Sequence, residues 1–449
     1  MADLAVNFAG IRSPNPFWLA SGPPTNTYGQ VARAFDAGWG GAVWKTVGEP
    51  IVNVFSRYGS VDLGKTRIMG FNNIELISDR PIADNLREIA EVKRKYPGNA
   101  VIVSLMVESR REAWHEMMKR VEDTGADAVE LNFGCPHGMS ERGMGAAVGQ
   151  VPDYTCQIVE WVKEVAKVPV IVKLTPNVTD VTYIARAAKK GGADALSLIN
   201  TINSIVGVDL DEFAPLPSVA GKSSHGGYCG PAVKPIALHL VSAVAGHPEV
   251  RLPVSGIGGI TTWRDAAEFI ALGAETLQVC TAVMHHGFRI VEDLTDGLSN
   301  WMDDKGIRSI AELRARALGK VTSWENLDLN HHLLAVIHQD KCIRCELCYT
   351  ACEDGAHQAI RRLPREDGGP VVEIIEEACV GCNLCSQVCP VEGCITMEPI
   401  PSGFPPVTWK ELAAGKGTLA PRLGHGGSSA DADGPPMVTT PVGAPVNSG

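Results

Sequence analysis

The cysteines are the first residues of this sequence that indicate a specific chemistry. The chain has 13 of them, and nine fall between Cys342 and Cys394. Two runs there share the spacing Cys-x2-Cys-x2-Cys-x3-Cys. Three cysteines at this spacing wrap one [4Fe–4S] cluster, and the fourth cysteine of each run ligates the other cluster. The pattern therefore predicts two clusters and a role in carrying electrons.

The spacing also predicts which cysteines share a cluster. Structural zinc is the alternative, but zinc prefers paired Cys-x2-Cys half-sites rather than two triplets. The first run departs from the usual pattern, because Glu353 stands where proline is common, and Cys394 is expected to be a packed thiol. The expected ligands of one cluster are Cys342, Cys345, Cys348 and Cys389, and those of the other are Cys379, Cys382, Cys385 and Cys352.

Polar residues also follow apolar runs in the first 320 residues, at places where buried strands should end. Among them are Lys45-Thr46, Asn132, Lys173, Asn200-Thr201 and Cys280-Thr281. A lysine at a buried strand end needs a partner. That partner is either a carboxylate in a structural ion pair or a flavin ring, whose anionic reduced form is stabilised by a nearby cation. Both partners remain open for Lys45 and Lys173.

A glycine pair, an asparagine group and a thiol add further chemistry. Gly258-Gly259 lets the backbone approach an anion at the start of a helix, although a plain tight turn is the simpler interpretation. Asn73, Asn132 and Asn200 each offer a donor and an acceptor, which suits the amide edge of a pyrimidine-like ring, although a single Asn is more often a loop cap. Cys135 lies in a Gly- and Met-rich loop that resembles a mobile lid, where a thiol can move a proton or simply pack.

The elements that must position these residues follow a βα pattern. Short apolar runs alternate with amphipathic helical stretches, which favours parallel strands. Gly-Ala-Asp recurs at residues 125–127 and 192–194 and Gly-Ala-Glu at 273–275, where helices should end and strands begin. A doubly wound sheet usually shows Gly-x-Gly-x-x-Gly after its first strand, and that motif is missing here. The expected strands of a (β/α)8 barrel are 17–20, 41–46, 100–106, 126–133, 168–174, 193–199, 252–257 and 274–280.

Composition narrows the class of protein. The chain has 449 residues with 45% hydrophobic and 20% charged residues, which is typical of a folded protein. Its net charge of −11 argues against nonspecific nucleic-acid binding. No apolar run is long enough for a membrane span and no secretory signal is evident, so we expect a cytoplasmic protein with reduced thiols.

These observations together predict four regions. Residues 1–320 form the barrel, 321–334 a linker, 335–400 a ferredoxin-like domain with two [4Fe–4S] clusters, and 401–449 a Gly- and Pro-rich tail that is disordered or extended. Residues 57–79 are expected to be a long loop at the mouth of the barrel, where function concentrates.

At these motifs the sequence resembles the dihydropyrimidine dehydrogenase family, especially its bacterial NAD-dependent subunits with FMN and two iron–sulfur clusters. The barrel is similar to that of dihydroorotate dehydrogenase. The resemblance covers about residues 4–399, and the order of barrel then ferredoxin makes it specific. It is carried by Glu130-Leu-Asn-Phe-Gly-Cys-Pro-His-Gly138, Lys173-Leu-Thr-Pro-Asn-Val-Thr-Asp180, Asn200-Thr201, Gly230-Pro-Ala-Val-Lys-Pro-Ile-Ala-Leu238 and Leu277-Gln-Val-Cys280.

The resemblance implies a reaction and its site residues. In uracil reduction, hydride passes from FMN to C6 of the ring, and the Cys135 thiol protonates C5 from the other face. Asn73, Asn132, Asn200 and Thr201 would hold the pyrimidine. FMN would contact Ala20, Ser21, Lys45, Thr46, Lys173, Gly230, Ile257, Gly258, Gly259, Cys280 and Thr281.

The chain departs from the mammalian members of the family in two ways. Gly134 precedes Cys135 where the mammalian pattern has Ser. The chain also begins at the barrel, so a partner subunit with FAD and NAD(P) is expected, in a hetero-oligomer such as a heterotetramer with a homodimeric core. The alternatives are a dihydroorotate dehydrogenase-type flavoenzyme, whose substrate carboxylate would need an extra cation, and an electron-transfer subunit without pyrimidine chemistry.

Overall fold

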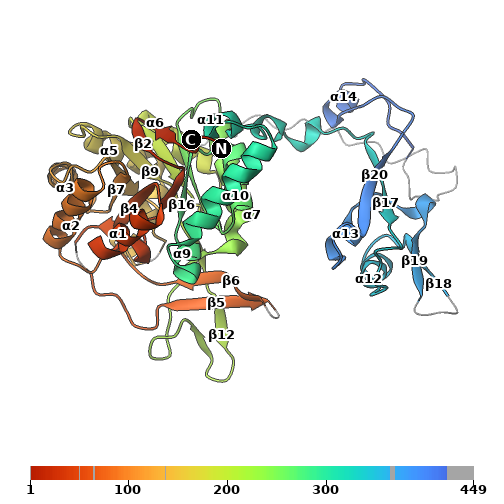
Figure 1. Cartoon of the computed structure of the whole chain (residues 1–449), viewed down its shortest axis with the longest axis horizontal. Helices are drawn as coiled ribbons and strands as arrows, with labels where there is room; N and C mark the ends of the chain where they lie inside the picture. The colour runs from red at the N-terminus through yellow and green to blue at the C-terminus, as the bar shows by residue number, and fades with distance from the viewer. Residues whose placement is uncertain (1, 50, 64–65, 137, 365–369, 422–449) are drawn as a thin grey trace, which may run out of the picture. The chain divides into compact units, whose positions relative to one another are not determined.

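The structure is a computed structural model that describes residues 2–49, 51–63, 66–136, 138–364 and 370–421. It divides into two compact units, Met1–Val321 and Thr322–Gly449 (Figure 1), each described by itself below. Among the helices in these ranges, none combines the length and the apolar character that a membrane crossing requires.

The first unit is built around a closed barrel of eight parallel strands, as the sequence predicts. Each strand is buried along its whole length, because the barrel interior covers one face and the outer helices cover the other. A short hairpin of β1 (Val6–Phe8) and β2 (Ile11–Ser13) packs Phe8 edge-on against Trp18 in the core beneath the barrel. The barrel strands are β3 (Phe17–Leu19), β4 (Gly41–Val47), β7 (Ala100–Leu105), β8 (Ala128–Asn132), β9 (Val170–Lys173), β10 (Ala195–Leu198), β15 (Val254–Ile257) and β16 (Thr276–Val279).

Helices surround this barrel and pack their apolar faces on it. The repeated Gly-Ala-Asp motif shows how each helix connects to the next barrel strand. Gly125 and Gly192 have φ values of 78° and 97°, which end a helix in the left-handed region that glycine adopts most easily. Asp127 and Asp194 then accept the backbone N–H of the preceding strand, at 2.8 and 2.7 Å. The main helices are α1 (Tyr28–Ala37), α2 (Ile82–Lys95), α3 (Arg111–Glu122), α5 (Pro152–Lys163), α6 (Val181–Lys190), α7 (Lys234–Gly246), α8 (Trp263–Ala271), α9 (Thr281–His286) and α10 (Ile290–Asp304).

The segment 57–79 is not the loop that the sequence predicts. It contains the antiparallel strands β5 (Tyr58–Leu63) and β6 (Thr66–Asn73), which join β14 (Gly226–Cys229) and β11 (Ile202–Ser204) in a four-stranded sheet. We name this the mouth sheet. Its register depends on pairing between β6 and β14, which are far apart in the sequence, so local patterns cannot reveal it.

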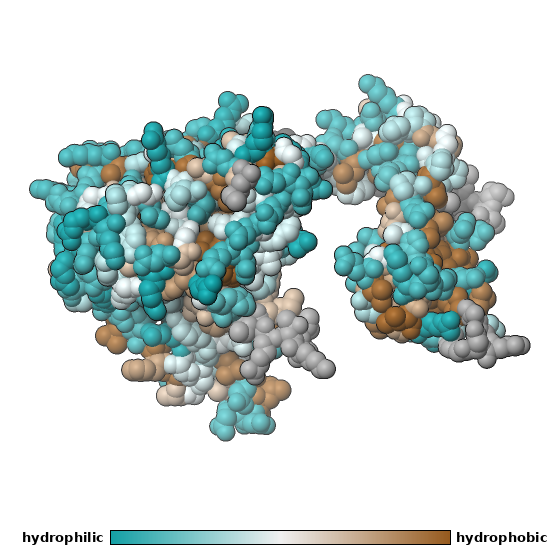
Figure 2. Space-filling view, in the orientation of Figure 1, coloured by the Kyte–Doolittle hydropathy of each residue, from teal (hydrophilic) through white to brown (hydrophobic). Residues whose placement is uncertain are grey.

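The mouth sheet and the neighbouring segments expose many apolar side chains. Figure 2 shows hydrophobic residues gathered on the part that carries β5 and β12 (Gly207–Asp209). Tyr58 and Met69 of the same sheet reach the cavity described below, so apolar surface continues to the cavity wall. The most exposed of these side chains are Val52, Phe55, Ile205, Leu210 and Phe213.

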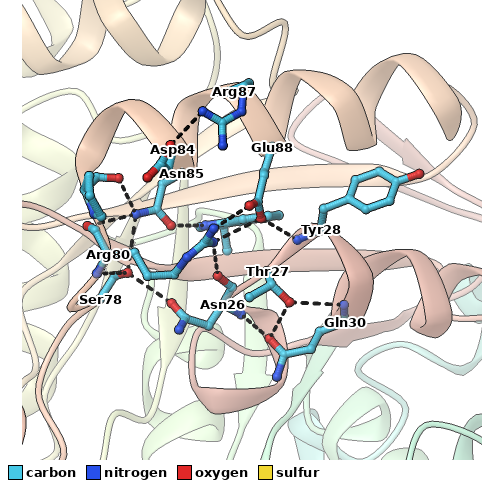
Figure 3. Close-up of polar contacts among 12 residues, drawn as sticks. Asn26, Thr27, Tyr28, Gln30, Ser78, Arg80, Asp84, Asn85, Arg87 and Glu88 are labelled. Carbon is cyan, nitrogen blue, oxygen red and sulfur yellow. Dashed lines mark hydrogen bonds and ion pairs between the residues drawn. The ribbon is translucent and has the colours of Figure 1, made fainter.

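A polar cluster connects the end of segment 57–79 to the barrel (Figure 3). Arg80 donates to the backbone oxygen of Asn26 at 2.6 Å and pairs with Glu88. Asn85, which is fully buried, accepts from Trp44 Nε1 of β4 at 3.0 Å. The cluster therefore anchors the chain beside the strand that carries Lys45 and Thr46.

The cysteine-rich part of the second unit, as far as the structure describes it, is built from two small antiparallel sheets and the short helices α12 (Leu347–Glu353) and α13 (Leu384–Val388). Strand β17 (His332–Ile337) pairs with β20 (Ile395–Ile400), and β18 (Ile360–Leu363) pairs with β19 (Val371–Ile374). The helices α12 and α13 each follow the first two cysteines of a run. The core of this unit combines apolar residues with the buried thiols of Cys348, Cys352, Cys379, Cys385 and Cys394.

Residues 401–421 are not the disordered or extended segment that the sequence predicts. They fold against the segment after Thr322 and contain the helix α14 (Trp409–Ala413). Asn330 is buried there; it donates to the backbone oxygens of Pro405 and Thr418 and accepts from Ala420 N, at 2.6, 3.0 and 2.9 Å. The Asn330 side chain, which is distant in sequence, thus supplies hydrogen-bond partners to the backbone of this Gly- and Pro-rich segment. The rest of the expected tail, 422–449, lies outside the described residues.

Candidate active site

A cavity of about 450 Å³ opens at the carboxyl ends of the barrel strands, within the size range of ligand pockets. Every residue that the sequence analysis expects to contact the flavin or the pyrimidine, or to move the proton, lines it. They come from seven barrel strands or the loops after them, from β6 of the mouth sheet and from Gly230, which directly follows β14. These residues are Ala20, Ser21, Lys45, Thr46, Asn73, Asn132, Cys135, Lys173, Asn200, Thr201, Gly230, Ile257, Gly258, Gly259, Cys280 and Thr281.

Three of the polar residues form one hydrogen-bonded chain. Asn132 Nδ2 donates to Thr46 Oγ1 at 2.9 Å, and Asn200 Nδ2 donates to Asn132 Oδ1 at 3.0 Å. Asn200 Oδ1 in turn accepts the backbone N–H of Thr201 at 2.8 Å. These bonds fix the orientation of both amide groups. Asn73 lies on β6 of the mouth sheet, where its Nδ2 donates to the backbone oxygen of Gly227 at 3.1 Å.

Both lysines of the cavity face glutamates. Lys45 Nζ lies 2.5 Å from Glu75 Oε1, and Lys173 Nζ lies 3.6 Å from Glu130 Oε1. Each lysine is about 5% exposed and also lines the cavity. The ion-pair and ligand alternatives are thus compatible, because each ammonium has a carboxylate on one side and the cavity on another.

The loop that carries Cys135 is folded back on itself. The backbone oxygen of Cys135 accepts from Ser140 Oγ at 2.7 Å and from Ala146 N at 3.0 Å. Gly145 has φ 59°, and a β-carbon there would lie 2.9 Å from that oxygen. The loop contains the short helix α4 (Ala146–Gly149), and His137 of the motif lies outside the described residues. The thiol of Cys135 is half-buried and lines the cavity.

The end of the cavity near α8 has the features of an anion site. Gly258 and Gly259 have φ values of 129° and 76°, and a β-carbon on Gly259 would lie 2.9 Å from the backbone oxygen of Gly230. Asp265 Oδ2 accepts the N–H groups of Thr261 and Thr262 at 3.0 and 2.8 Å. Burial works to raise the pKa of Asp265, but bonds from Lys234 and these N–H groups lower it overall. The capping fixes the start of α8 shortly after the two glycines.

In the second unit, two small cavities are lined by cysteines, and each contains one of the two predicted ligand sets. Cys342, Cys345, Cys348 and Cys389 surround one, and Cys352, Cys379, Cys382 and Cys385 surround the other. In the described ranges, no three His, Cys, Asp or Glu side chains converge as ligands of a single ion. Four thiols that frame a hollow suit a cluster with its own inorganic core. Cys394, also buried, lines the first cavity.

Comparison with known proteins decides between the families. The profile of the family described as "Dihydroorotate dehydrogenase" matches residues 3–302, and that of the "4Fe-4S dicluster domain" matches residues 335–397. The NAD-dependent dihydropyrimidine dehydrogenase subunit PreA of Escherichia coli K12 is 43% identical over 89% of this chain and 96% of its own length. This chain belongs to the dihydropyrimidine dehydrogenase family. It is therefore an oxidoreductase, and the prediction of a flavin barrel followed by a two-cluster domain is confirmed.

Further relatives of this dihydropyrimidine dehydrogenase family member show which other proteins share its barrel. The chloroplastic dihydropyrimidine dehydrogenase (NADP+) of Arabidopsis thaliana is 44% identical over 72% of this chain and 79% of its own length. The catalytic subunit of dihydroorotate dehydrogenase B from Pyrococcus horikoshii is 38% identical over 70% of this chain and 98% of its own. A crystal structure of DHODH from Eimeria tenella with ferulenol has a TM-score of 0.58 at 19% identity, covering 70% of this chain and 88% of that one, which shows the shared fold.

Several cavity residues of this dihydropyrimidine dehydrogenase relative escaped the sequence analysis. Glu75 pairs with Lys45 and accepts from the Tyr58 hydroxyl; burial first, and then this bond, raise the pKa of Tyr58. Tyr58 stacks on Phe71 at 5.3 Å between ring centroids. The sequence offered one signal for Glu75, which is its place two residues after Asn73, but the aromatic residues carry no motif. The sequence analysis also did not identify the lining residues Met69, Tyr228, Cys229 and His285.

Proposed function

We propose that this chain is the catalytic subunit that interconverts uracil or thymine and the 5,6-dihydropyrimidines. One observation carries the proposal: three asparagine amides and a thiol line the same cavity as two buried lysines. A pyrimidine presents alternating C=O and N–H groups, which carboxamide side chains and Thr201 can match. When bound, FMN supplies the hydride donor or acceptor, and the two [4Fe–4S] clusters carry single electrons.

In this proposal the residues of the chain bind the ring and move one proton. The pyrimidine is oriented by Asn73, Asn132, Asn200 and Thr201. The amide N–H groups of the asparagines stabilise the negative charge that develops on its carbonyl oxygen. As hydride arrives at C6, the Cys135 thiol gives its proton to C5 and becomes a thiolate, which solvent reprotonates. Oxidation of the dihydropyrimidine runs the same steps in reverse.

FMN would be held by the residues along the barrel mouth. Lys45 and Lys173 would face the ring, where their positive charges favour the anionic reduced form. Gly258 and Gly259 would receive the phosphate, as their backbone conformation and the capped start of α8 suggest. The other contacts would come from Ala20, Ser21, Thr46, Gly230, Ile257, Cys280 and Thr281.

The relative named PreA is one subunit of an enzyme, which implies a partner chain. We assign that partner the FAD and NAD(P) sites, so that electrons reach the clusters of this chain from it. A heterotetramer with a homodimeric core is the assembly we propose. The reaction belongs in the cytoplasm, where the cysteines that ligate the clusters stay reduced.

Dihydroorotate dehydrogenase activity is the second candidate, because the barrel is 38% identical to such an enzyme. Its substrate carries a carboxylate that needs a cation. Among the described residues, Lys45 and Lys173 are the lysines that line the cavity, and no arginine does so. The proposal assigns both lysines to the flavin ring, so no further lysine or arginine of the described lining is left for a substrate carboxylate, and the cavity favours an uncharged ring.

An assay on the native complex tests the proposal. We expect NAD(P)+ reduction that depends on dihydrouracil and not on dihydroorotate. Cys135→Ala should lower turnover by at least about a hundredfold, the usual contribution of a positioned proton donor. Cys156→Ala, at a buried thiol of α5 away from the cavity, is the matched control. Unchanged turnover in Cys135→Ala, with full flavin and iron content, would contradict the assigned role.

A further inference from the structure

A carboxylate lies inside the barrel, beneath the cavity. Glu130, on β8, is fully buried. Its Oε2 accepts from Ser197 Oγ and from Gln278 Nε2, both at 2.8 Å. Its Oε1 has no hydrogen-bond partner among the described residues and lies 3.6 Å from Lys173 Nζ. Burial of a carboxylate is costly unless a charge and hydrogen bonds compensate it, so this arrangement depends on Lys173.

The surroundings of Glu130 form one layer of the barrel interior. Glu130, Ser197 and Gln278 come from β8, β10 and β16, which alternate around the barrel as the members of one layer do. Branched apolar residues usually fill such layers. A polar layer at this place is therefore a departure from ordinary barrel packing, and it lies directly behind the lysine of the cavity.

The two lysine–glutamate pairs differ in kind. Lys45 makes a hydrogen-bonded ion pair with Glu75, which lies two residues after β6 of the mouth sheet, at 2.5 Å. Lys173 stands beyond hydrogen-bond distance from Glu130, and its ammonium makes no hydrogen bond within the described ranges. Attraction between the charges holds Lys173 at the cavity floor while its N–H groups stay available for a ligand.

We propose that Glu130 is a positioning residue that holds the Lys173 ammonium against the bound flavin and moderates its positive charge, which keeps the flavin reduction potential low. The inference rests on the proposed placement of FMN beside Lys173. Lys173 stabilises the anionic reduced flavin, and a carboxylate at 3.6 Å on the opposite side weakens that effect. A purely structural Glu130 would influence folding and leave the potential unchanged.

The decisive measurement is the midpoint potential of the flavin in the FMN-loaded complex. Glu130→Gln keeps the size and can still accept both hydrogen bonds while it removes the charge. We expect the equilibrium to shift about tenfold toward reduced flavin, which corresponds to about 30 mV for a two-electron couple. Glu116→Gln makes the same charge change on the exposed face of α3 and should leave the potential unaltered. An unshifted potential in Glu130→Gln overturns the proposal.

A double variant tests whether the effect runs through Lys173. Without that ammonium, Glu130 has no charge beside the flavin to position or to moderate. Glu130→Gln should then change little in the Lys173→Met background, and a full additive shift would show that Glu130 acts by another route. If Glu130→Gln fails to fold, Glu130→Asp draws the carboxylate back by one methylene and should shift the potential less, in the same direction; no shift overturns the proposal. None of these measurements uses a pyrimidine, so they are independent of the proposed substrate.

Discussion

Gly134 leaves the space that Asn200 occupies. A β-carbon on Gly134 would lie 2.4 Å from Asn200 Cβ and 2.5 Å from its Nδ2, a contact that real side chains do not make. Gly134 N also donates to Asn132 Oδ1 at 3.2 Å, so both asparagines depend on this backbone position. The sequence marks Gly134 as a departure from the mammalian pattern, and the structure adds that this arrangement of Asn200 requires it.

Gly134→Ala should therefore damage substrate binding more than folding. The new methyl group must push Asn200 away from Asn132 and break the amide chain. We expect kcat/KM for the pyrimidine to fall by about tenfold or more, which is about 1.4 kcal/mol of transition-state stabilisation. Steady-state kinetics measure it, with flavin content as a check on the fold. Gly98→Ala, where no atom lies within 4 Å of the added methyl, is the control, and equal kinetics in both variants would contradict the prediction.

The iron content should distinguish cluster ligands from a neighbouring thiol. Cys352 and Cys394 are both buried, but only Cys352 belongs to one of the two predicted ligand sets. Cys394→Ala should keep about eight iron atoms per chain, whereas Cys352→Ala should lose about half of them. Iron analysis on anaerobically purified protein measures the content. Loss of iron in Cys394→Ala to the same extent would show that the ligand assignment is wrong.

Two thiols of the cavity should resist alkylation at neutral pH. Burial raises the pKa of Cys229 to about 11, against a smaller lowering by Thr281. Burial, followed by the charge of Cys229, raises the pKa of Cys280 to about 12. The thiolate is the reactive form, so the alkylation rate of each should rise about tenfold per pH unit between pH 7 and 10. Mass spectrometry after iodoacetamide treatment follows each site, and fast modification at pH 7 would refute the prediction.

Acid should loosen the phosphate end of the cavity. The pKa of Asp265 lies below its ordinary value, so the folded state holds the ionised form more tightly than the unfolded state does. Its contribution to stability is present above the unfolded value, near pH 4, and is lost as the pH falls through the folded value. FMN release, followed by fluorescence, should increase below pH 4.

Asp265→Asn supplies the control for this acid effect. This variant cannot ionise, so we expect it to bind FMN more weakly than the wild type at pH 7. The difference between the two proteins should shrink as the pH drops, because protonated Asp265 resembles the amide. A constant difference from pH 7 to pH 3 would rule out Asp265 as the titrating group.

The sequence predicted the barrel because its signals are local. Each strand is a short apolar run, buried on both faces, and each Gly-Ala-Asp motif marks one turn between helix and strand. The mouth sheet had no such signal, since β6 pairs with β14 about 150 positions later, as the Asn73–Gly227 bond shows. The fold of residues 401–421 was missed for the same reason, because Asn330 donates to Pro405, which lies 75 positions away.

The sequence by itself predicted two sets of cysteine ligands, and it determined which fold the first 320 residues adopt and which family the chain resembles. Those conclusions rest on spacing within a few residues or on repeated short patterns. Only the tertiary structure decided which carboxylate faces each lysine, since Glu75 and Glu130 lie 30 and 43 positions from Lys45 and Lys173 along the chain. Such pairs form when strands and loops meet in space, and no local pattern records that meeting.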